Sequence, residues 1–263
     1  MLEMFSLIYF IWSFLAIAIV VGLYFAFRHK STTFQWNLLF GFTIFAWILH
    51  FSRLWLDPDL ETRMLFFEDL CGFNTMLFPF LIKSKNKVAK DIMFFVAALF
   101  ASHSLFYPNN IEGDPILYFN TIRFFFAHLI LVSVPVLMVS WKLHSPSFTS
   151  YPYLVLYISI GALYNFYLSS MLVRSGLETH YYNYMGIWGG YGTVYDLFEK
   201  VAPFLRYTTE VAGQEISKPI PIIYLYPGLI LYYTPVWFLM GFPMWVPWIK
   251  KWKASNLNNG ESR

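Results

Sequence analysis

The sequence predicts an all-α integral membrane protein, a bundle of about seven transmembrane helices forming a single polytopic membrane domain over residues 1–263. Of its 263 residues, 58% are hydrophobic and only 13% are charged, which is more apolar than one soluble core of this length requires. The apolar residues stand in long continuous runs, whereas the strands of a membrane barrel alternate polar with apolar residues. Helices are therefore expected.

Seven apolar runs reach or approach the roughly 20 residues that a spanning helix needs. The first run follows Glu3 rather than basic residues and lacks a small-residue cleavage site, so we expect it to be a retained helix and not a signal peptide. The fourth run is the shortest. In chain order, the runs are Phe5–Phe27, Phe34–Leu54, Met64–Ile82, Ile92–Tyr107, Ile116–Trp141, Tyr151–Val173 and Ile222–Trp248.

The loops between these runs differ in positive charge, which predicts the orientation. Eleven Lys and Arg residues fall on one side of the predicted membrane and five on the other, and the positive-inside rule places the eleven in the cytoplasm. The N-terminus is then outside and the C-terminus cytoplasmic, as an odd number of helices requires. Residues 249–263 form a basic cytoplasmic tail. The eleven are Arg28, Lys30, Lys83, Lys85, Lys87, Lys90, Lys142, Lys250, Lys251, Lys253 and Arg263.

One long connection, residues 174–219, lies outside in this topology and is rich in Tyr and Trp. Such amphipathic rings favour the headgroup level, which suggests an interfacial loop held by its aromatic side chains. The alternative is a lid over an outer chamber.

Charge and cysteine content exclude several classes of protein. The net charge is only +3 and the basic residues form short clusters between apolar runs, so no nucleic-acid partner is expected. The single cysteine, Cys71, cannot form an internal disulfide. No cofactor and no metal is predicted, and the expected location is the plasma (cell) membrane.

Ionisable and amide side chains gather in the half of the bilayer that this topology places outside. A charged group in hydrocarbon costs about 2.5 to 3.5 kcal/mol even on a lenient insertion scale, so each one needs a reason. Their shared depth indicates one polar site between helices. The residues are His50, Arg53, Glu68, Asp69, Cys71, Asn74, His103, Asn120, Arg123, His128 and Asn165.

Cys71 and His128 are the candidate reactive pair. Counted from the predicted helix ends at about 1.5 Å per residue, Cys71 lies roughly 10 Å and His128 roughly 18 Å below the outer edge, a gap that shifted helix ends would close. Glu68 and Cys71 share a helix face at spacing i, i+3. A buried Cys is also often an inert small hydrophobe. Arg53 and Arg123 would by default be counter-ions for Glu68 and Asp69.

Four short motifs resemble the YwaF-type integral membrane family, whose eukaryotic branch includes the transmembrane protein 164 acyltransferase. They are His50–Arg53, Phe66–Cys71, Phe124–His128 and Asn183–Met185. The resemblance implies a seven-helix fold with a working Cys and His, carried onto Cys71 and His128, and transfer of an acyl chain from a phospholipid.

The leading hypothesis is a lipid acyltransferase with a thioester intermediate. Cys71 attacks a phospholipid ester, His128 takes the thiol proton, and Glu68 or Asp69 orients the imidazole. The acceptor is a lysolipid or the amine of a lipoprotein. The predicted substrate-binding residues, some of which could steady the oxyanion, are Arg53, His50, Asn74, Asn120 and Arg123.

Three other functions stay open. A metal-dependent membrane lipid hydrolase could use His50, His103, His128, Glu68 and Asp69 as ligands, although no local ligand spacing supports it. A carrier or channel could bind a cation at Glu68 and Asp69, but the cytoplasmic halves of the helices are almost purely apolar. A structural or partner-binding role needs only that the polar groups hold the helices together.

Overall fold

The computed structural model describes residues 6–57, 60–106, 111, 113–179, 206–211 and 214–219. Its longer helices coincide with predicted apolar runs, and the seventh run, Ile222–Trp248, lies outside the described residues. The helices are α1 (Leu7–Phe27), α2 (Thr32–Phe51), α3 (Arg53–Leu56), α4 (Asp69–Lys83), α5 (Lys87–Val96), α6 (Ser102–Phe106), α7 (Phe119–Ser140) and α8 (Tyr151–Arg174), with short helical turns η1 (Thr62–Leu65), η2 (Ala97–Ala101) and η4 (Phe148–Ser150).

Five helical stretches of the described chain are long and apolar enough to cross a membrane: Leu7–Phe27, Thr32–Leu56, Arg63–Lys83, Phe119–Ser140 and Pro152–Arg174. The fourth predicted run, Ile92–Tyr107, lies mostly in a composite that is not among these five, in which the π-helical turn η2 joins α5 to α6. The protein is therefore helical in its membrane region and multi-pass. The count of seven and the absolute orientation stay predictions.

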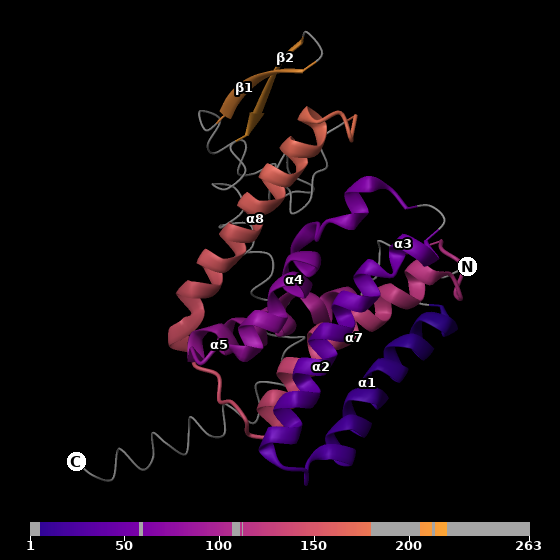
Figure 1. Ribbon diagram of the computed structural model, residues 1–263, viewed down its shortest axis with the longest axis vertical. Coiled ribbons are helices and arrows are strands. Elements are labelled where there is room, and N and C mark those ends of the chain that lie inside the picture. Colours follow the sequence, from indigo (N-terminus) through magenta and orange to yellow (C-terminus); the bar gives the residue numbers. More distant parts are fainter. Residues whose placement is uncertain are drawn as a thin grey trace, which may run out of the picture.

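Helix α7 is the centre of the bundle and contacts α1, α2, α4, α5 and α6 (Figure 1). Helix α8 packs on α4 and α5, on the far side from α1. The core is apolar and lies where these helices meet, with Val134, Leu137 and Met138 of α7 fully buried. Helix α1 instead exposes large apolar side chains such as Leu7 and Phe14, as expected for a helix facing lipid.

The basic loops meet at one end of the bundle, which we call the lysine end. Lys83 lies 4.2 Å from the Phe40 ring near the start of α2, and Trp141, which follows α7, donates from Nε1 to the Tyr24 carbonyl near the end of α1 at 3.4 Å. These contacts join the loops that carry most of the predicted cytoplasmic charge. The opposite end, which carries Arg53, Arg63 and Arg123, is the arginine end.

The third helix differs from its predicted range. The apolar residues Met64–Phe67 suggested that it begins at Met64, but the chain makes only a short 3-10 turn there and α4 begins at Asp69. Asp69 has a φ of 62°, which no α-helix accommodates, so the helix starts anew at this residue. Cys71 is consequently in the first turn of α4.

Two other segments depart from the sequence-based description. Helix α5 begins at Lys87 rather than at Ile92, because the Asn86 side chain accepts from the Val88 N–H at 2.9 Å and caps the helix. Within the predicted 174–219 connection, β1 (Arg206–Val211) and β2 (Gln214–Pro219) pair as an antiparallel hairpin, with Arg206 opposite Pro219. Residues 180–205, which hold all the aromatic residues of that connection except Tyr207, lie outside the described residues.

Candidate functional site

The first turn of α4 is fixed by Asp69 and by Asn165 of α8. The Asp69 N–H donates to Asn165 Oδ1 at 2.9 Å, and Asn165 Nδ2 donates to the Asp69 carbonyl at 3.3 Å. The Asp69 side chain accepts from the Gly72 N–H at 2.7 Å, which satisfies one of the free donors at the helix start. These bonds fix the backbone at Asp69 and Gly72, on either side of Cys71.

Gly72 follows the cysteine at a close approach of the backbone. A Cβ at this position would lie 2.9 Å from the carbonyl carbon of Phe67, so no other residue fits without a shift of the chain. Glycine therefore lets the segment before α4 fold back onto its first turn. Cys71 owes its position to this tight entry into the helix.

The Cys71 thiol faces Ser104 of α6. Its Sγ lies 3.9 Å from the Ser104 Oγ, while that hydroxyl donates to the Phe100 carbonyl at 3.3 Å. Because the serine proton is used toward Phe100, the thiol is the donor to Ser104. The described residues provide no hydrogen bond between Cys71 and His128, so the sulfur in this conformation is a protonated thiol turned toward α6.

His128 is buried in α7, with only 7% of its surface exposed. Its Nδ1 lies 2.8 Å from the Phe124 carbonyl and its ring packs 4.1 Å from the Phe124 ring. Since a carbonyl only accepts, Nδ1 carries the proton, and in the neutral imidazole Nε2 is then the free base. Phe124 thus fixes the tautomer of His128.

Ser104, the hydrogen-bond partner of Cys71, lies on α6, which contacts α7. Leu105, next to Ser104, packs with Phe124 and Phe125 of α7, and Ser102 lines the same cavity as Leu129. Helix α7 contacts both α6 and α4. Counted from the observed helix starts, Cys71 is the third residue of α4 and His128 is the tenth residue of α7, so the late start of α4 does not close the difference in depth that the sequence predicts. The meeting of the two side chains stays a prediction.

At the arginine end, Glu68 has a direct ion pair with Arg63, while Arg53 and Arg123, the counter-ions predicted from sequence, lie within electrostatic range of Glu68 and Asp69. Glu68 accepts from Arg63 Nη1 through both carboxylate oxygens at 3.2 Å, and Arg63 also pairs with Glu61. Arg63 is one of the five basic residues that the charge distribution places on the outer side. Arg63 and Glu68 are only five residues apart, which could have indicated the pairing. The apolar residues from Met64 onward instead suggested a continuous helix, and the break before Asp69 gave no signal in the sequence.

Arg53 and His50 hold the segment that precedes Glu68. Arg53 Nη1 donates to the Met64 carbonyl at 2.8 Å, and His50 Nε2 donates to the Leu65 carbonyl at 3.1 Å. The His50 ring also stacks on Phe67 at 4.1 Å. Both side chains are buried, so in this conformation they position the entry to α4.

The remaining predicted residues lie on α4 and α7. Asn120 Oδ1 accepts from Arg123 Nε at 3.4 Å. Arg123 lies within electrostatic range of Arg53, Asp69 and Glu68. Asn74 is fully buried and accepts from the Tyr157 hydroxyl at 2.7 Å, which ties α4 to α8. Its Nδ2 finds no hydrogen-bond partner in the described part of the chain.

The described residues contain no group of three or more His, Cys, Asp or Glu side chains that could hold a metal ion together. Glu68, Asp69, His50 and His128 each make the contacts given above. The side chain of His103 lies outside the described part.

A second polar cluster, at the lysine end, was not predicted. Asp91 of α5 is fully buried and accepts from His144 Nε2 at 2.6 Å, from the Ser150 hydroxyl at 2.6 Å and from the Ser147 N–H at 3.3 Å. The sequence placed Asp91 among basic loop residues, which gave no sign of burial. Three donors from the chain between α7 and α8 explain why it can be buried.

The described fold defines a class: a multi-pass helical membrane protein with a thiol and an imidazole on contacting helices. The chain belongs to the TMEM164 family, whose model matches residues 1–241. This match confirms the resemblance drawn from the sequence motifs. No curated protein and no solved structure matches the chain.

Proposed function

We propose that this protein is an integral-membrane lipid acyltransferase in which Cys71 is the nucleophile and His128 the base. The carrying observation is that Cys71 and His128 lie on contacting helices, α4 and α7, and that the bond from His128 Nδ1 to the Phe124 carbonyl leaves Nε2 as the base. Membership of the TMEM164 family supports the same assignment.

The proposed reaction has two half-reactions. A rotation of the Cys71 side chain brings Sγ from Ser104 to His128 Nε2, which takes the thiol proton. The thiolate attacks the ester carbonyl of a phospholipid, the ester C–O bond breaks, and the leaving lysolipid oxygen takes the proton from the imidazolium. The hydroxyl of a lysolipid, or the amine of a lipoprotein, then attacks the thioester, passes its proton to His128 and releases the thiolate.

The other predicted residues have supporting roles in this proposal. Arg123 and Asn120 stand one to two turns from His128 on α7 and would meet the oxyanion or the lipid phosphate, as would the free amide of Asn74. Asp69 and Glu68 would act as positioning residues through the start of α4, and His50 and Arg53 through the segment before it.

The topology of the proposal is the one that the charge distribution predicts. Residues Ile222–Trp248 supply a seventh span, the N-terminus is outside, and the arginine end faces the outer leaflet of the cell membrane. Phospholipid would then enter the site laterally from that leaflet. The apolar surroundings would disfavour water as an acceptor.

Labelling with a clickable phospholipid tests the proposal. The purified protein, incubated with the lipid, should gain a label that hydroxylamine removes, and Cys71→Ala and His128→Phe should lower the label at least 100-fold. His29→Phe is the matched control, because His29 is exposed beyond α1, and it should label like the wild type. Equal labelling of wild type and Cys71→Ala overturns the thioester.

A further inference from the structure

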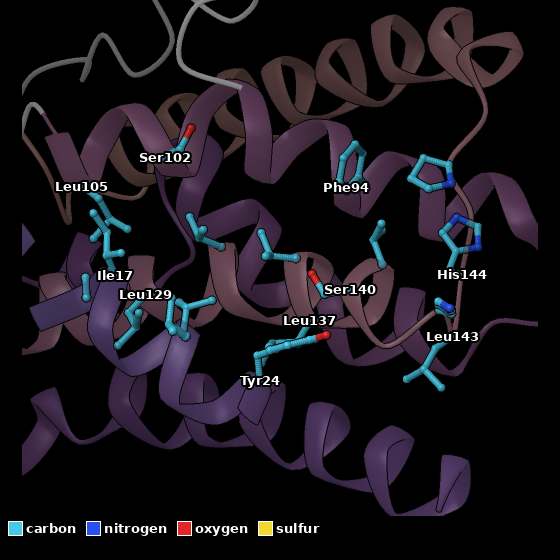
Figure 2. Close-up of a pocket in the computed structure, with 18 of the residues that line it drawn as sticks. Ile17, Tyr24, Phe94, Ser102, Leu105, Leu129, Leu137, Ser140, Leu143 and His144 are labelled. Carbon is cyan, nitrogen blue, oxygen red and sulfur yellow. The ribbon is translucent and has the colours of Figure 1, made fainter. Parts of the chain in front are cut away.

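A large cavity opens between α1, α5, α6 and α7, apart from the Cys71 site. Its volume is about 1230 Å³, above the roughly 300 to 1,000 Å³ of pockets for drug-sized ligands. Figure 2 shows Leu105, Leu129 and Leu137 spaced along it, with His144 at its end. Its lining on α7 runs from Leu129 to Ser140, which at 1.5 Å per residue is about 16 Å, and continues to Lys142 beyond the end of the helix. Such a long apolar slot suits an acyl chain.

The two ends of the cavity differ in charge. At the lysine end it is lined by Lys87, Lys142 and His144, and the described lining residues include no Asp or Glu. The Asp91 carboxylate that could neutralise this end is fully buried and bonded to His144, Ser147 and Ser150. The cavity is therefore complementary to a molecule with an anionic head and an apolar tail.

The backbone conformation of Lys142 suggests that its side chain has a role beside the cavity. Lys142 has a φ of 63°, in the left-handed region where helices usually end on glycine. The following N–H groups of Leu143 and His144 both donate to the Met138 carbonyl, at 3.0 and 3.3 Å, as in a helix-ending turn. Glycine would form this turn without strain, so a lysine here points to a role for the side chain.

We propose that this cavity binds an anionic phospholipid of the leaflet at the lysine end, with the phosphate between Lys87 and Lys142 and an acyl chain between α1 and α7. Helix α7 ends at Ser140, about 18 Å along the helix from His128, and Lys142 lies beyond that end. The ester bonds of a lipid seated here are therefore far from Cys71. This lipid is a bound component that joins α1 to the bundle, and the inference does not rest on acyl transfer.

Native mass spectrometry of the full chain in detergent tests the site, with phosphatidylglycerol and phosphatidylcholine titrated in parallel. Wild type should bind phosphatidylglycerol at least tenfold more tightly, and Lys87→Gln with Lys142→Gln should reduce the preference to within twofold. The matched control is Lys30→Gln with Lys85→Gln, which removes two charges at the same end but outside the cavity lining, and it should keep the preference.

A single substitution separates lipid binding from folding. Lys142→Gly removes the charge and relieves the left-handed backbone, so it should weaken phosphatidylglycerol at least fivefold while the melting temperature in lipid-free detergent stays level or rises. Retained preference in the double variant, or an equal loss in the control pair, overturns the proposal. Full competition by inorganic phosphate also overturns the proposal, because the apolar slot would then contribute nothing to lipid binding.

Discussion

The two polar ends of the bundle each contain one residue, other than glycine, with a left-handed backbone: Asp69 at the arginine end and Lys142 at the lysine end. Among the described residues these are the two such cases. Asp69 is bonded on both sides by Asn165 and caps α4, so its strain is held by the fold. Lys142 is exposed beside a cavity. The same backbone conformation thus serves packing at one end and presents a charge at the other.

Asp91 gives the largest expected effect on stability. Asp91→Ala leaves His144 and two serine donors without their buried acceptor, which should cost about 3 to 5 kcal/mol of the free energy of unfolding. The matched variant Glu68→Ala breaks a partly exposed pair with Arg63 and should cost about 1 kcal/mol or less. Steric trapping in bicelles measures both. Equal losses of unfolding free energy in the two variants would show that the deeper burial of Asp91 does not make its contacts more stabilising than those of Glu68.

Asn165→Leu comes next. It removes both bonds that brace the Asp69 backbone and leaves a buried N–H without its acceptor, at a cost of about 2 to 3 kcal/mol. Ser159→Ala on the same helix removes a bond to the Val155 carbonyl only and should change stability by about 0.5 kcal/mol. The readout is the same unfolding free energy. An Asn165→Leu variant as stable as Ser159→Ala would mean that Asp69 holds its conformation unaided.

Gly161→Ala tests how closely α4 and α8 pack. A Cβ on Gly161 would lie 3.0 Å from the Phe73 ring, so we expect about 1 to 2 kcal/mol of destabilisation. Gly41→Ala, where nothing lies within 4 Å, is the control and should be neutral or stabilising. Thermal unfolding in detergent is sufficient to rank the two. Equal midpoints would place the helices further apart than described.

Ser104→Ala has the smallest expected effect on stability and the most informative one on chemistry. It removes the acceptor of the Cys71 thiol, so the thiol should turn toward His128 more often and react several-fold faster with iodoacetamide at neutral pH. His128→Phe combined with Ser104→Ala should cancel this gain. Because Cys71 is the single cysteine, the label reports on this thiol alone. An unchanged labelling rate in Ser104→Ala would show that Ser104 does not control the reactivity of Cys71.

The sequence predicts the helices correctly where the length of an apolar run alone decides their extent. The spans of α1, α2, α7 and α8 follow from apolar length, and their predicted ends differ from the observed ones by a few residues. The start of α4 was wrong, because apolar residues 64–67 fit a helix equally well and only the tertiary bonds of Asp69 show the break.

The site was predictable in its residue types but not in its contacts. Cys71 and His128 stand out because ionisable or reactive groups are rare in apolar helices, and their roles stay predictions. Ser104 gives no such signal, since a serine in a membrane helix commonly bonds its own backbone. The burial of Asp91 likewise depends on Ser147, Ser150 and His144, which lie more than 50 residues away along the chain.

The π-helical turn Ala97–Ala101 sets which way the fourth span faces. Its bond from the Ser102 N–H to the Ala97 carbonyl encloses one residue more than a regular α-helical turn. Each residue advances an α-helix by roughly 100°. Without that extra residue, α6 would be rotated by about this angle relative to α5, and Ser104 would look away from the sulfur. An insertion of one residue thus decides the direction in which α6 presents the Ser104 hydroxyl, the partner of the Cys71 sulfur.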